Sequence, residues 1–71
     1  MKYMVILEEG EASYGAHVPD FPGCIAVGES REEVLGLIRE AIELHADGLK
    51  EAGVPVPPPS SVSEYIDVNA A

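Results

Sequence analysis

The sequence predicts a single α+β domain with the order strand, strand, strand, helix, strand, in which one helix covers one face of a four-stranded mixed sheet. Three observations predict it. Short apolar or alternating runs come first, a long stripe at helical spacing follows, and another alternating run ends the chain. A helix between two strands favours a right-handed crossover, which places the last strand parallel to the first. With 71 residues, the chain is assigned to one domain over residues 1–71.

Three strands are expected before the helix. The first is apolar at both parities, which is typical of a central strand covered on both sides. The second alternates and ends at Pro19, which has no N–H to donate to a ladder. The third is expected to direct Ile25 and Val27 inward. These strands are expected at residues 2–8, 13–18 and 24–29.

The helix is predicted from its two ends and its periodicity. Ser30 followed by Glu33 forms a capping box, in which the hydroxyl and the carboxylate each accept a bond from a free amide. Gly53 ends the helix because it adopts a left-handed turn without strain. Apolar positions between them recur in steps of three and four. The stripe consists of Val34, Ile38, Ala41, Ile42, His45 and Leu49.

The last part of the chain contains a connector and a strand. Prolines make residues 54–59 an extended, polyproline-like spacer, and a ligand for an SH3-type domain is the alternative interpretation. Residues 62–68 are expected to form the fourth strand, with Ile66 and Val68 inward.

The small size of the chain predicts self-association as a homodimer or higher oligomer. Burial and chain entropy nearly cancel at this length, so small domains usually need an additional source of stability. A single cysteine excludes an internal disulfide, and Cys24, His17 and His45 lack the spacing of a zinc site. A sheet covered on one face leaves the other bare. The helix also has apolar side chains outside its main stripe, at Leu35, Leu37 and Leu44.

The charge of the chain limits the classes of partner that it is expected to bind. Thirteen acidic residues against four basic ones give a net charge of −9. Direct binding to nucleic acid or to an anionic membrane is therefore not expected, whereas a basic protein would be attracted. Solubility alone is the alternative role of this charge. No targeting or membrane-spanning segment is visible and the lone thiol suits a reducing compartment, so a cytoplasmic location is expected.

One stretch is more specific than these patterns. It reads YGAHVPDFPGC over residues 14–24, continues with GES at 28–30, and includes the helical EAIEL at 40–44 and GVPVP at 53–57. It resembles the HicB-like antitoxins, over roughly residues 1–69. The resemblance implies a βββαβ domain of partial RNase H-like fold and a basic, RNA-cleaving partner, the HicA toxin. Many members also have a C-terminal DNA-binding segment. This sequence shows none, so direct operator binding is not expected.

Two groups of residues are candidates for partner contact. In the loop after the second strand, Asp20 and Phe21 either contact a partner or serve the turn, Asp20 by bonding amides beyond it and Phe21 by entering the core. The rigid frame of this loop is expected from Pro19, Pro22, Gly23 and Cys24. On the helix, carboxylates can match the basic patch of an RNA-binding toxin, although a solvated face is the simpler role of a charge run. These are Glu40, Glu43 and Asp47.

Catalysis is not expected, and neither is a cofactor or a metal. Cys24 has no basic neighbour in the sequence that would activate it and is interpreted as a buried apolar residue, while His17 and His45 are expected to pack or hydrogen-bond. The alternatives are a degenerate RNase H-like nuclease dependent on metal ions and a dimeric regulatory scaffold. The nuclease would draw its metal ligands from Glu8, Asp20, Glu29 and Glu33.

Overall fold

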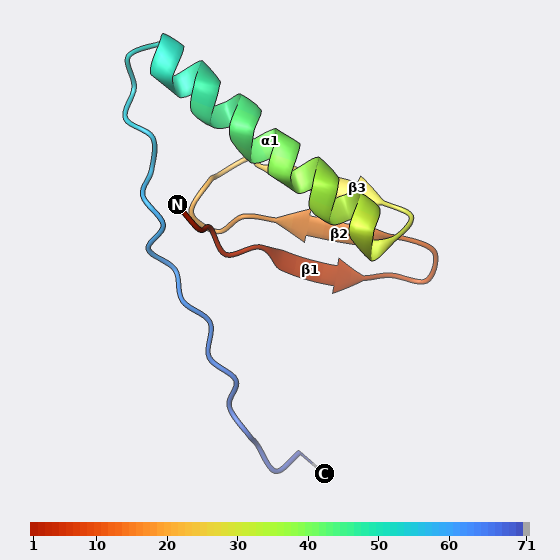
Figure 1. Cartoon of the computed structure of the whole chain (residues 1–71). Helices are drawn as coiled ribbons and strands as arrows, with labels where there is room; N and C mark the ends of the chain where they lie inside the picture. Colours follow the sequence, from red (N-terminus) through yellow and green to blue (C-terminus); the bar gives the residue numbers. More distant parts are fainter. Residues whose placement is uncertain (71) are drawn as a thin grey trace.

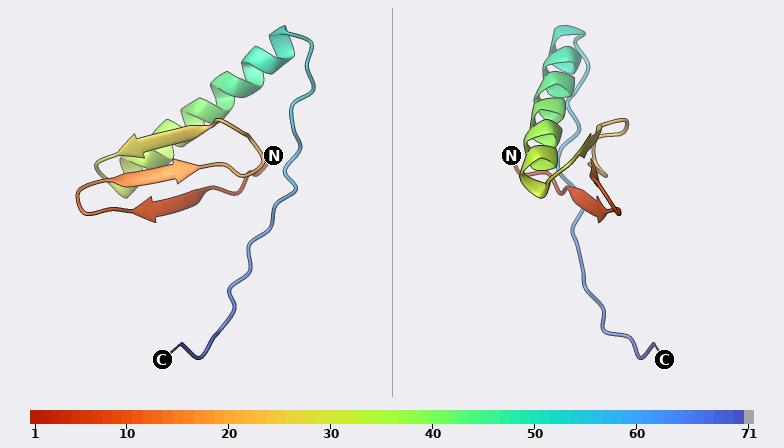
Figure 2. Two further views of the ribbon diagram at one scale, coloured as in Figure 1. Left: turned by 180° about the vertical axis from the view of Figure 1, so that it is seen from behind. Right: turned by 90° about the vertical axis from the view of Figure 1, so that its right-hand side faces the viewer.

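A computed structural model describes residues 1–70 and shows three strands followed by one long helix (Figure 1). Strands β1 (Ile6–Glu9), β2 (Tyr14–His17) and β3 (Ile25–Gly28) form an antiparallel sheet in the order β1-β2-β3. Helix α1 (Arg31–Glu51) lies across one face of the sheet, and the opposite face is uncovered (Figure 2). The predicted α+β class and the order of the first four elements are confirmed.

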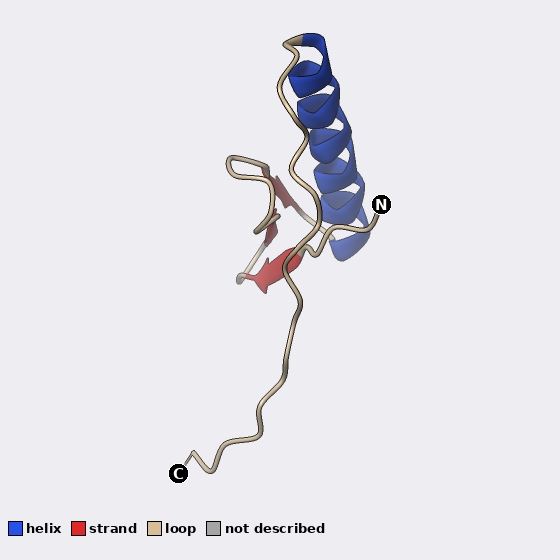
Figure 3. Ribbon diagram, turned by 90° about the vertical axis from the view of Figure 1, so that its left-hand side faces the viewer, coloured by secondary structure: helices blue, strands red, loops and turns tan. Residues whose placement is uncertain are grey.

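The predicted fourth strand is not formed in the single chain. Residues 62–68 have no strand partner and run away from the body as an extended segment (Figure 3). The sheet is therefore three-stranded and antiparallel rather than four-stranded and mixed, and β1 is an edge strand rather than a central one. The prolines between residues 55 and 59 hold the connector extended, and it carries the chain past β1 without turning back along it.

The prediction for the inward face of β3 is also wrong. Ile25 and Val27 are 70% and 67% exposed, whereas Ala26 and Gly28 face the helix. Because side chains alternate along a strand, a shift of one residue exchanges the two faces. The small residues are needed inside, since a β-carbon at Gly28 would lie 3.0 Å from the backbone nitrogen of Val34. Close approach of α1, rather than hydrophobicity, therefore decides which face of β3 is buried.

This close approach predicts opposite effects for two glycine substitutions. Gly28→Val adds atoms where the helix backbone leaves no space, so we expect a loss of about 1–3 kcal/mol in the free energy of unfolding. Gly36→Ala lies inside α1 with no atom within 4 Å of the added carbon, and we expect a gain of about 0.5–1 kcal/mol. Urea unfolding followed by circular dichroism measures both. Equal stability of the two variants would contradict this account of the helix–sheet contact.

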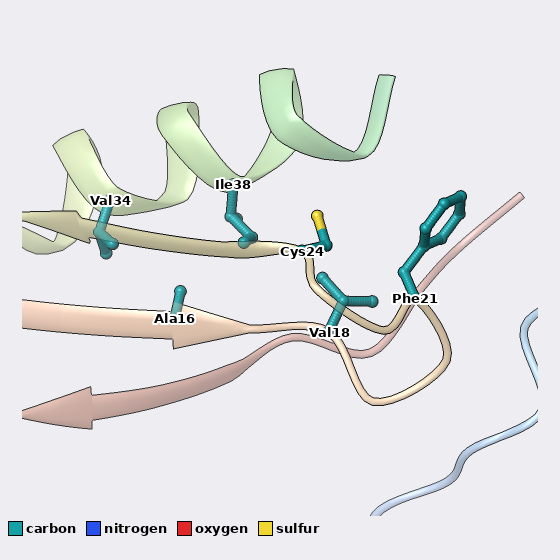
Figure 4. Close-up of a cluster of buried hydrophobic side chains, with 6 residues drawn as sticks. All are labelled: Ala16, Val18, Phe21, Cys24, Val34 and Ile38. Carbon is teal, nitrogen blue, oxygen red and sulfur yellow. The ribbon is translucent and has the colours of Figure 1, made fainter. Parts of the chain in front are cut away.

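The core lies between α1 and the β2–β3 half of the sheet (Figure 4). Half of its fully buried side chains come from the loop that joins β2 to β3 rather than from the regular elements. That loop is therefore part of the hydrophobic core. The buried residues are Ala16, Val18, Phe21, Cys24, Val34 and Ile38.

Both ends of α1 have local capping contacts. Ser30 is the N-cap residue, and its hydroxyl oxygen accepts a hydrogen bond from the Glu33 N–H at 3.1 Å. The Glu33 carboxylate accepts from the N–H of Glu29 at 3.2 Å, one residue earlier than the cap itself. At the other end Gly53 has a φ of +71°, in the left-handed region. These contacts fix the points at which the chain enters and leaves the helix.

Candidate partner-binding surface

The loop between β2 and β3 is closed by its own backbone. The N–H of Val18 donates to the carbonyl of Cys24 at 3.2 Å, and the N–H of Cys24 donates to the carbonyl of Phe21 at 3.1 Å. A third bond of 3.1 Å runs from the Phe21 N–H to the Val18 carbonyl. Gly23 has a φ of +83°, which a residue with a β-carbon adopts only with strain. The exposed rim of the loop is formed by Pro19, Pro22 and Gly23.

Phe21 anchors this loop from inside. Its side chain is 2% exposed and packs edge-on against two rings, Tyr3 at 5.3 Å and His45 at 6.0 Å between centroids. The N-terminal segment, the loop and α1 therefore meet at one aromatic ring. The side chain of Phe21 therefore lies in the core, which is one of the two roles considered for it.

Asp20 holds the C-terminal segment rather than its own turn. One carboxylate oxygen, Oδ2, accepts from the N–H groups of Ser60 and Ser61, both at 2.9 Å. The other, Oδ1, accepts from their hydroxyls, at 3.0 Å for Ser60 and 2.6 Å for Ser61. The expected bonds to amides just beyond Asp20 are replaced by this contact across 40 residues of chain. We call Asp20, Ser60 and Ser61 the carboxylate latch.

The carboxylate latch favours the ionised form of Asp20. Hydrogen bonds from the side chain and backbone of Ser61, and then from Ser60, lower the pKa of Asp20 from its ordinary value near 3.8 to about 2. A depressed pKa in the folded state means that the ionised carboxylate stabilises the latch above about pH 4. This contribution is lost as the pH falls through about 2.

We therefore expect the latch to open in acid and in an Asp20→Ala variant. Amide hydrogens of Ser60 and Ser61 should exchange roughly tenfold faster or more in the variant at pH 6, because charge-assisted bonds are lost. An NMR titration should place the midpoint for the Asp20 carboxyl near 2 rather than near 4. Glu11→Ala, in an exposed turn, is the control. An ordinary pKa for Asp20 with unchanged exchange would contradict the latch.

The acidic candidates on α1 share one exposed face. Glu40, Glu43 and Asp47 are exposed, and their spacing places them on the side of the helix away from the core. Among residues 1–70 the only acid–base contact within 4.0 Å joins His17 to Glu8, so these three carboxylates have no ion-pair partner there. We call them the acidic row.

The cysteine and the two histidines occupy separate places. Cys24 is 1% exposed, and burial raises the pKa of its thiol, which disfavours the reactive thiolate. The Nδ1 atom of His17 lies 3.9 Å from a carboxylate oxygen of Glu8 on the uncovered sheet face. His45 is on α1 against Phe21.

The four carboxylates considered as metal ligands do not converge. Asp20 accepts hydrogen bonds from two serines and Glu33 accepts one from the backbone N–H of Glu29, while Glu8 lies beside His17. No group of three or more His, Cys, Asp or Glu side chains within residues 1–70 is placed to hold a metal ion. In the same part of the chain, no helix is long and apolar enough to cross a membrane.

Sequence reasoning missed two features of this surface. The serines of the latch are distant from Asp20 in sequence, and the only available signal was a pair of hydroxyl residues directly after the prolines. The second feature is the direction of Ile25 and Val27, which point outward with the 38%-exposed Ile6 and make the uncovered sheet face, itself expected from the sequence, apolar. Alternation in β3 predicted a buried face and an exposed one but not which was which.

The fold and surface define a small, strongly acidic α+β domain whose core includes its β2–β3 loop. The family model for the HicB-like antitoxin of bacterial toxin–antitoxin systems matches residues 3–70. This chain belongs to that family.

Individual relatives agree with this assignment. The chain is 31% identical over 72 residues to antitoxin HicB 2 of Photorhabdus laumondii, covering all of this chain and 52% of the relative. It is 31% identical over 67 residues to an uncharacterized 14.9 kDa protein of Haemophilus phage HP1, covering 94% of this chain and 50% of that protein. It thus spans about half the length of these relatives.

A solved structure, the HicA3 and HicB3 toxin–antitoxin complex, contains a similar fold. The TM-score is 0.69 with 25% sequence identity, and the match covers 83% of this chain and 70% of that one. The likeness therefore includes most of the elements described above.

Proposed function

We propose that this chain is a cytoplasmic antitoxin that binds a small, basic, RNA-cleaving toxin of the HicA type and occludes its RNA-binding surface. The observation that carries the proposal is the acidic row, in which Glu40, Glu43 and Asp47 are exposed on one helix face without ion-pair partners among residues 1–70. Family membership and the likeness to a HicA3–HicB3 complex support it.

The proposed mechanism is electrostatic competition. A toxin that binds RNA needs exposed lysine and arginine side chains for the phosphates. Carboxylates held on a helix can occupy the same cations, and the net charge of −9 would speed the encounter. The backbone-closed loop from Val18 to Cys24 lowers the entropy lost on binding because it is already ordered. The chain would act by covering the toxin, without catalysis and without contacting nucleic acid itself.

The test combines binding with RNA cleavage. Titration calorimetry with a purified HicA-type toxin should give a stoichiometry near one to one, and excess chain should stop the toxin from cleaving RNA. Association should slow as salt is raised, because steering between charged proteins is screened. Full toxin activity in the presence of excess chain would refute the proposal. Cleavage of RNA by the chain alone with Mg²⁺ or Mn²⁺ would instead support the nuclease alternative.

A further inference from the structure

The sheet is incomplete along β1. This strand pairs with β2 on one side only, and α1 packs over β2 and β3. Val5 and Leu7 reach the core but are only half-buried. A hollow of about 350 Å³ lies beside residues 4–7. The free edge of β1 therefore offers unpaired backbone groups next to a partly open apolar surface.

The chain also contains a strand-like segment that is not paired with any strand among residues 1–70. Residues 62–68 are long enough for a strand and alternate, with Val62, Ile66 and Val68 at one parity. These three side chains are 84%, 81% and 72% exposed, so the segment has a row of uncovered aliphatic groups of the kind that marks an interaction surface. Residues 62–68 thus have the sequence pattern of a strand but form none in the single chain, and both observations are explained if the strand forms on another chain.

Anchors upstream direct this segment to the edge of β1. Tyr3 donates a hydrogen bond from its hydroxyl to the carbonyl of Pro57, and the carboxylate latch fixes Ser60 and Ser61. Ser63 and Tyr65 then line the hollow beside residues 4–7, after which the chain departs from the body (Figure 1). The segment thus reaches the start of β1 and is carried beyond it.

We propose that residues 62–68 add as a fourth strand to the β1 edge of a second copy of this chain, which returns its own segment in the same way. A two-fold exchange pairs both free edges and covers both sets of aliphatic side chains with one repeated interface. The connector favours this over closure within one chain, because its prolines and the carboxylate latch hold residues 55–61 in an extended course that carries residues 62–68 past β1. A second copy has the required edge and the required strand in its own sequence.

Sedimentation and hydrogen exchange on the full chain test this exchange. We expect a dimer of twice the 7.5 kDa chain mass and slow exchange of amides between residues 63 and 68. Isotope-filtered NMR on a mixture of labelled and unlabelled chains should show contacts between residues 62–68 of one copy and residues 5–7 of the other. A monomer, whether its segment is protected on its own β1 or exposed to solvent, would overturn the proposal.

Matched variants test whether the dimer interface is formed by residues 62–68 or by another surface. Ile66→Ser/Val68→Ser should raise the dimer Kd by at least about 100-fold, since four aliphatic side chains leave the interface. Asp67→Ser, at the other parity and not among the residues that line the hollow, should change it by less than about tenfold. The substituted residues lie outside the core, so helical circular dichroism should be unchanged in both variants. A dimer that tolerates the first variant as well as the second would place the interface elsewhere and refute the exchange.

Discussion

Phe21→Ala is expected to unfold the domain at ordinary temperatures. Its ring is 2% exposed and joins Tyr3, the β2–β3 loop and His45 of α1. Removing a buried phenylalanine costs about 3–5 kcal/mol through lost burial and the cavity left behind. The free energy of unfolding of a 71-residue domain is only a few kcal/mol, because net stability is a small difference between large opposing terms. The single substitution therefore removes a large part of the total.

Urea unfolding and near-ultraviolet circular dichroism measure this effect. Phe21→Leu keeps most of the volume and should cost less than about 1.5 kcal/mol. Ile25→Ala is the control for removing a large apolar side chain, since Ile25 is 70% exposed and should change stability by about 0.5 kcal/mol or less. If Phe21→Ala were as stable as Ile25→Ala, the loop would be an appendage rather than part of the core.

The helix could be predicted because its signals are local. Ser30 and Glu33 are three residues apart, Gly53 follows the last turn, and the apolar stripe has the period of a helix. Each of these features acts through bonds within a few residues. These local signals do not depend on tertiary packing. The structure accordingly places α1 between the two ends that the sequence indicates.

The strands were harder to predict than the helix, because the faces they bury and the strands they pair with depend on distant residues. In β3 the larger Ile25 and Val27 were expected inside, yet Gly28 is inside because α1 approaches too closely for a side chain. For residues 62–68 the alternation indicates a strand, but whether a strand forms depends on where an edge is available. Local pattern describes what a segment can do, and the packing of the whole chain decides what it does.

The candidate site shows the same division. The acidic row is visible in sequence because helical spacing alone places Glu40, Glu43 and Asp47 on one face. The role of Asp20 was not visible, because its partners lie 40 residues away and are brought to it by the course of the connector. Phe21 had two open roles in the sequence, and the structure shows that its side chain enters the core. Contacts between distant segments are thus what the structure adds.

Reversing the charge of the acidic row should weaken toxin binding more than any other surface change. In a Glu40→Lys/Glu43→Lys/Asp47→Lys variant, three groups that would face lysine and arginine become repulsive. We expect the association rate with a HicA-type toxin to fall by about 100-fold at low salt, since steering contributes factors of 10 to 1,000. The fold should persist because these side chains are exposed and make no ion pair among residues 1–70. Stopped-flow binding and RNA cleavage measure the two consequences.

A control variant with the same change in net charge distinguishes the effect of the acidic row on toxin binding from the effect of the total charge. Glu11→Lys/Glu29→Lys/Asp67→Lys also replaces three exposed acids, at positions away from the outer face of α1. Long-range attraction depends on the summed charge and should fall equally in both variants, whereas contact at the row is lost only in the first. A toxin covered by this helix should therefore dissociate faster from the first variant and resume cleaving RNA, while the second still inhibits it. Equal inhibition by both would mean that the toxin is bound by another face, and the apolar outer surface of the sheet around Ile25 and Val27 would then be the surface to substitute next.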